Sequence, residues 1–122
     1  ASASKRHEYL RWAVQNDRFI VEDDFESEFS LSQKPEETLF SHTSNDNVIY
    51  MNTFSMTVSP SFRVGYMVLP KHLVCEFEER LGFYSCTVPT YVQFVVAELI
   101  SNGDFERHIN RVRRAKRKEL NK

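Results

Sequence analysis

The chain has 122 residues, a formal net charge of −1 and two cysteines; 41% of its residues are hydrophobic and 27% are charged. This length suffices for one domain with a core, and the apolar fraction is too high for a disordered segment. No apolar run reaches the ~18 residues of a membrane span, and the low glycine count argues against a glycine-rich phosphate loop. Because Cys75 and Cys86 form neither a CxxC pair nor a disulfide framework, we expect a cytoplasmic protein. Because no apolar run is long enough to span a membrane, we expect no membrane partner.

The first part of the chain predicts a helix and then a strand. Residues 4–16 carry an apolar stripe at helical spacing. The apolar run at residues 19–21 predicts a buried strand of a parallel sheet, which stops at the carboxylates of residues 22–24. Residues 30–47 are polar and predict a long loop of the kind that serves a function or contacts a partner.

The second part of the chain predicts two more strands and three helices. We expect strands at residues 48–51 and 64–69, on either side of a hydroxyl-rich segment. Helices are expected at residues 71–82, 90–101 and 104–122. This order predicts an α/β layered domain whose three strands make a thin sheet for the class. The sheet is therefore either a piece of a larger sheet or is completed by a partner chain.

The charge is unevenly distributed along the chain. Residues 1–103 carry a balance of −6, whereas residues 104–122 carry +5. A basic terminal stretch is one route to nucleic acid, but a solvated helix face is the more common explanation. We expect residues 1–122 to form a single unit, with a core at 4–103 and a basic helix at 104–122.

Two segments carry side chains that suit a ligand. The acidic cluster at residues 22–28 could bind Mg²⁺ or Ca²⁺, hold a cationic ring nitrogen or face water, and it lacks EF-hand spacing. Residues 53–63 combine five hydroxyl side chains with Arg63, which suits a phosphate because a guanidinium offers charge-assisted donors. A polar loop with a salt-bridged arginine is the alternative. The four histidines show no metal-ligand spacing, and neither cysteine has an evident base partner.

Three segments match the pattern of one protein family. Residues 22–29, EDDFESEF, resemble the E-D-D-Y-D-S-E-F segment of MocR-type (GabR-like) transcriptional regulators. Residues 48–70, VIYMNTFSMTVSPSFRVGYMVLP, are similar to that family's V-I-Y-x-G-T-F-S-K-T-L-S-P-x-x-R-I-G-Y-x-x-x-P. Residues 108–114, HINRVRR, resemble its H-I-R-R-M-R helix. These regulators join a winged-helix DNA-binding domain of the GntR class to a domain with the fold of type I pyridoxal-phosphate aminotransferases.

The resemblance covers almost the whole chain and implies that the chain is a fragment. It corresponds to the second half of the large cofactor-binding subdomain, so its three short strands with flanking helices would form part of that α/β subdomain's sheet. The winged-helix domain, the first half of the large subdomain and the small subdomain fall outside it. Residues 104–122 would connect the large subdomain to the small one, which favours the solvated helix face over DNA binding.

The resemblance also implies how residues of the chain would bind pyridoxal phosphate. Asp23 matches the aspartate that pairs with the pyridine nitrogen and keeps it protonated, so that the ring acts as an electron sink. Ser55 and Arg63 match residues that hold the phosphate of the cofactor. These three residues would support non-covalent binding at best.

Other positions depart from the family pattern. Met56 stands where the family has the Schiff-base lysine, and a thioether can neither form an imine nor shuttle a proton. Phe25 replaces a tyrosine that hydrogen-bonds the ring oxygen of the cofactor, and Asn52 replaces a glycine. The losses at Met56 and Phe25 predict a homologue without catalytic residues.

We therefore expect a fragment of the aminotransferase-like, effector-binding and pyridoxal-phosphate-binding domain of a MocR-type regulator, inactive as an enzyme. The parent protein would bind DNA through its winged helix and sense a small molecule. Two alternatives remain: a fragment of a class I/II aminotransferase that is active with its missing parts, and a stand-alone interaction module that dimerises. Homo-oligomers are expected because a half-domain exposes apolar surface.

Overall fold

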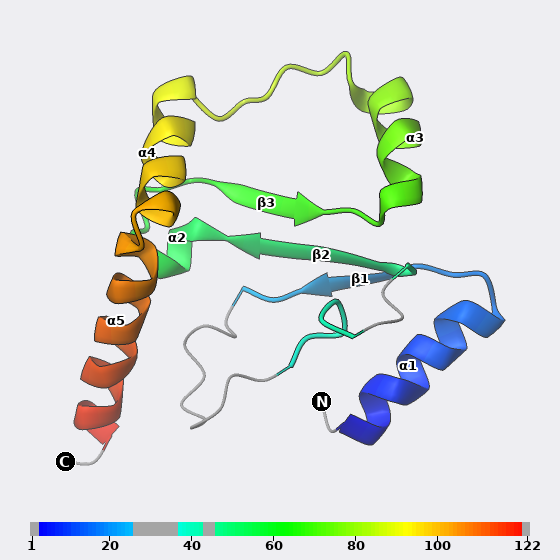
Figure 1. Ribbon diagram of the computed structural model, residues 1–122, viewed down its shortest axis with the longest axis horizontal. Coiled ribbons are helices and arrows are strands. Elements are labelled where there is room, and N and C mark those ends of the chain that lie inside the picture. The colour runs from blue at the N-terminus through cyan, green and yellow to red at the C-terminus, as the bar shows by residue number, and fades with distance from the viewer. Residues whose placement is uncertain (1–2, 26–36, 43–45, 121–122) are drawn as a thin grey trace. The chain divides into compact units, whose positions relative to one another are not determined.

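The structure, a computed structural model, describes residues 3–25, 37–42 and 46–120. Within these residues the chain folds into helices and short strands (Figure 1): α1 Ala3–Gln15, β1 Ile20–Asp23, β2 Val48–Thr53, α2 Phe54–Thr57, β3 Gly65–Val68, α3 Lys71–Leu81, α4 Thr90–Ser101 and α5 Asp104–Leu120. The predicted helices and strands are confirmed in kind and in order, whereas most of the predicted loop at residues 30–47 lies outside the described residues. The short helix α2 lies in the hydroxyl-rich segment, where the sequence predicted none.

The strands form one three-stranded sheet in the order β1-β2-β3. Strands β1 and β2 are parallel, with a register that runs from Ile20 opposite Val48 to Asp23 opposite Met51. The predicted parallel pairing is therefore confirmed. The predicted burial of residues 19–21 is wrong, because 58% of the Val21 surface is exposed. Strand β1 lies at the sheet edge, and its side chains alternate between a partly covered and an exposed face.

The described residues form two compact units, of which the first comprises residues 3–24, 37–42, 46–52 and 66–85. Its buried apolar side chains are Leu10 and Ala13 of α1 and Val48 of β2. Helix α3 of this unit, predicted at residues 71–82, carries an apolar stripe at helical spacing, but Val74, Phe77 and Leu81 are exposed. The apolar stripe therefore correctly predicts the helix, although its side chains are not buried in this chain.

The second unit comprises residues 25, 53–65 and 86–120. Phe54 and Ile109 are its buried apolar side chains, and the Phe54 ring meets the Phe105 ring edge-on with centroids 5.6 Å apart. Helices α4 and α5 are joined at Gly103, whose φ of +76° is a left-handed conformation that glycine adopts without strain. Among the helices of the described residues, none has both the length and the apolar character needed to cross a bilayer.

Candidate cofactor-binding residues

Hydrogen bonds fasten the start of α2 to the residues that precede β3. The Thr53 hydroxyl accepts a hydrogen bond from the Ser55 backbone N–H at 3.1 Å and donates one to the Val64 carbonyl at 3.0 Å. The backbone N–H of Phe54 donates to the same carbonyl at 2.8 Å. The Ser55 hydroxyl donates to the Phe62 carbonyl at 2.6 Å. Residues 53–64, here called the 53–64 loop, are thus closed on themselves within the second unit.

This closure places the Ser55 hydroxyl beside the backbone that carries Arg63. Ser55 binds the carbonyl of Phe62, the residue directly before Arg63, and the Arg63 backbone N–H donates to the Ser61 carbonyl at 3.1 Å. The Arg63 side chain is exposed, and no carboxylate of the described residues forms an ion pair with it. The loop therefore presents an available guanidinium. The proton of the Ser55 hydroxyl is already donated to Phe62, so Ser55 orients the loop and Arg63 carries the positive charge.

Met56 lies on α2 and is 49% exposed. Its neighbour Thr57 turns inward and is buried, and its hydroxyl donates back to the Thr53 carbonyl at 3.4 Å. The side chain at the position of the family's lysine is thus accessible but carries no amine. No lysine occurs in the 53–64 loop. Covalent attachment of an aldehyde cofactor at this loop therefore does not fit the residues present.

Asp23 and Phe25, the other two residues predicted to bind the cofactor, lie at and just after the end of β1. Asp23 is exposed and belongs to the first unit, on the opposite face of the strand from Glu22. Phe25 is exposed and is grouped with the second unit, as are Ser55, Met56 and Arg63. Two members of the predicted acidic cluster, at positions 26 and 28, lie outside the described residues.

The neighbours of Asp23 have structural roles that the sequence reading missed. The Glu22 carboxylate accepts hydrogen bonds from two successive backbone N–H groups, those of Leu39 at 2.8 Å and Phe40 at 3.0 Å. This carboxylate therefore anchors residues 37–42 to the sheet. No local pattern reveals such a contact, since the partners are separated by 17 and 18 positions in sequence.

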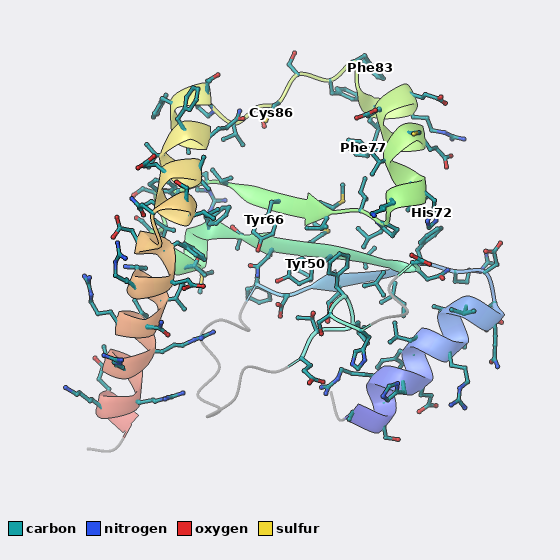
Figure 2. The ribbon with its side chains drawn as sticks, in the orientation of Figure 1. Tyr50, Tyr66, His72, Phe77, Phe83 and Cys86 are labelled. Carbon is teal, nitrogen blue, oxygen red and sulfur yellow. The ribbon has the colours of Figure 1, made fainter. Side chains whose placement is uncertain are left out.

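Asp24 joins a second network within the first unit. The Tyr50 hydroxyl donates to the Asp24 carboxylate at 2.8 Å and accepts a hydrogen bond from the Asn52 side-chain amide at 2.8 Å. Asn52 is buried, and burial raises the pKa of Tyr50 above its ordinary value, with the Asp24 contact adding to the effect. Figure 2 shows Tyr50 on β2 near Tyr66 on β3. The period of two in β2 places residues 50 and 52 on one face, which is the one signal in the sequence for this cluster.

The fold is that of aminotransferases. The chain superimposes on kynurenine aminotransferase of Pyrococcus horikoshii, solved in complex with PMP, with a TM-score of 0.81 and 30% identity over 93% of this chain and 28% of that chain. It also matches LysN, an α-aminoadipate aminotransferase of Thermus thermophilus complexed with N-(5'-phosphopyridoxyl)-L-leucine, with a TM-score of 0.78 and 29% identity over 96% and 31% of the two chains. The predicted fold class is therefore confirmed.

Sequence relatives narrow the resemblance to transcriptional regulators. The HTH-type transcriptional regulator YdeL of Bacillus subtilis is 40% identical over 95% of this chain and 25% of its own length. The "Probable rhizopine catabolism regulatory protein MocR" of Rhizobium meliloti is 33% identical over 86% of this chain and 21% of its own length. No protein-family model matches the chain. The predicted resemblance to MocR-type regulators is confirmed, and the chain spans about a quarter of the length of these relatives.

Proposed function

We propose that the chain is part of the effector-binding domain of a MocR-type transcriptional regulator and that its 53–64 loop binds the phosphate of pyridoxal phosphate without covalent attachment. The observation that carries the proposal is that the 53–64 loop has an exposed guanidinium at Arg63 but a thioether, rather than an amine, at position 56. The similarity to HTH-type regulators and to aminotransferases supports it.

In this proposal Arg63 binds the phosphate and Ser55 positions it. A guanidinium offers several fixed donors that match phosphate oxygens, and its interaction with a dianion is charge-assisted. The 2.6 Å bond from Ser55 to the Phe62 carbonyl limits the movement of the backbone that carries Arg63. The role of Asp23 beside the pyridine nitrogen, which the resemblance implies, remains a prediction for the exposed end of β1.

The same residues argue against catalysis by this segment. When bound, pyridoxal phosphate supplies an electron sink, and the enzymes that use it need a residue that moves a proton beside the ring. Met56 can neither attach the cofactor nor accept a proton, so the class I/II aminotransferase alternative is disfavoured. The parent protein would then respond to a small-molecule effector, bind DNA through a winged helix and form homo-oligomers.

Equilibrium binding of pyridoxamine phosphate tests the phosphate site. This ligand carries an amine in place of the aldehyde, so it cannot react with surface lysines and reports non-covalent binding alone. Losing a charge-assisted contact costs about 1.5–3 kcal/mol, so we expect Arg63→Gln to weaken binding by about tenfold to a hundredfold.

The matched control is Arg18→Gln, which removes another exposed arginine outside the 53–64 loop and should leave the affinity unchanged. Ser55→Ala should weaken binding less than Arg63→Gln, since the charge remains. An absence of binding at millimolar ligand, or an Arg63→Gln variant that binds as the wild type does, contradicts the proposal.

A further inference from the structure

Helix α5 has one apolar and one basic face. Ile109 is buried, and Phe105 of the same face meets Phe54 of α2 within the second unit. Four cationic residues recur on the opposite side at spacings of four, three and four positions: Arg107, Arg111, Arg114 and Lys118. Because a helix has 3.6 residues per turn, this spacing places all four on one face. Figure 2 shows nitrogen-tipped side chains standing out along this helix.

Three of the four cations on the basic face form no ion pair with a carboxylate of the described chain. The four cations, with Asn110 and Ala115, line a shallow groove, and none of these described lining residues is acidic. Arg107 is bound to Asp104 at 2.6 Å. Arg111, Arg114 and Lys118 form no ion pair with a described residue. Three outward-facing positive charges therefore remain in a row.

The geometry points to the phosphate backbone of duplex DNA as the partner of this face, in contrast to the solvated helix face that the family resemblance favours, and we propose this contact as an addition to any winged-helix contact. The proposal rests on the proposed function, because it presumes that the parent protein binds DNA. Arg107 and Lys118 are separated along the helix axis by about 16 Å, at 1.5 Å per residue. The axial rise between phosphates of one strand is about 3.4 Å, so several phosphates lie within this length.

An acidic protein partner fits the face less well. Stable protein interfaces are anchored by aromatic or other apolar side chains in a desolvated centre. Among the described residues that line the groove, the only apolar side chain is the methyl group of Ala115. Binding would therefore be almost wholly electrostatic, as in sequence-independent contacts to DNA.

Fluorescence anisotropy with a labelled DNA duplex of arbitrary sequence tests the proposal. The affected variant is Arg111→Gln/Arg114→Gln/Lys118→Gln, and glutamine keeps a helix propensity close to that of arginine and lysine. Each phosphate contact contributes about −0.9 to the slope of log K against log salt concentration. We expect the triple variant to reduce the magnitude of the slope by about 2.7. The ratio of the wild-type to the variant binding constant should therefore fall about 40-fold between 50 and 200 mM salt.

The control variant Arg11→Gln/Arg18→Gln/Lys71→Gln removes three exposed charges from other elements and should keep the slope. A slope that changes equally in both variants, or in neither, overturns the proposal. Poly-glutamate provides the second arm: if the wild type binds it as tightly as DNA, the face is an acidic-protein site and the proposal fails. Pyridoxamine phosphate binding is measured separately and does not involve Arg111, Arg114 or Lys118, so failure here leaves the proposed function standing.

Discussion

Replacement of Tyr50 by phenylalanine is the sharpest test of the network at the end of the parallel strand pair. The change removes one hydroxyl and with it the 2.8 Å bond to Asp24 and the 2.8 Å bond from Asn52. A hydrogen bond to a neutral group contributes about 1 kcal/mol and one to a charged group about 1.5–3 kcal/mol. We therefore expect the free energy of unfolding in urea to fall by about 2.5–4 kcal/mol.

Alkaline pH provides a second readout of the same residue. Since the folded chain keeps the Tyr50 proton to a higher pH than the unfolded chain, the unfolded chain deprotonates first, near pH 10. The stabilisation is present in full below about pH 10, and above it falls by at most about 1.4 kcal/mol per pH unit. The difference between wild type and Tyr50→Phe should therefore shrink above pH 10.

Tyr91→Phe is the matched control, because this tyrosine is exposed on α4. It should change the free energy of unfolding by no more than about 0.5 kcal/mol and leave the alkaline profile as it is. If Tyr50→Phe is as stable as Tyr91→Phe, or if its difference from wild type stays constant to pH 11, the network does not stabilise this part of the chain.

Two further substitutions test contacts of the backbone. Glu22→Gln keeps one acceptor oxygen where two backbone N–H groups bind, so amide hydrogen exchange at Leu39 and Phe40 should accelerate. The control Glu8→Gln, on the exposed face of α1, should leave this exchange unchanged. Unchanged protection in Glu22→Gln would refute the anchoring role. Gly103→Ala forces a left-handed alanine and should lower the free energy of unfolding by about 1–2 kcal/mol in urea. Gly103→Asn should cost less because asparagine tolerates this conformation, and equal losses would rule out backbone strain as the cause.

Periodic patterns in the sequence sufficed for most of the secondary structure. The helix at residues 90–101 is confirmed at both ends, and the strands at 48–51 and 64–69 are found with shifts of one or two residues. The hydroxyl-rich segment gave no helical signal, because α2 is only one turn long and depends on the Thr53 cap and on bonds to Val64. Such short elements are stabilised by contacts that local periodicity does not contain.

Burial was predicted less well than secondary structure. An apolar run was interpreted as a buried strand, yet Val21 is largely exposed because β1 is an edge strand in this chain. Some contacts of the candidate site could likewise be predicted from the sequence, and others could not. The loop that joins Ser55 to Arg63 follows from the sequence motif, whereas the partners of Glu22 and Tyr50 arise from the pairing of β1 with β2 and from a distant loop.

The central claim is that this chain, which we propose to be part of a MocR-type regulator, binds pyridoxal phosphate without a covalent link. Its most direct test is borohydride reduction after mixing with pyridoxal phosphate, followed by peptide mapping of every lysine. In the wild type we predict no stoichiometric adduct at any lysine. In Met56→Lys we predict one adduct at position 56, fixed as a secondary amine. A stoichiometric adduct on a single lysine of the wild type would contradict the account.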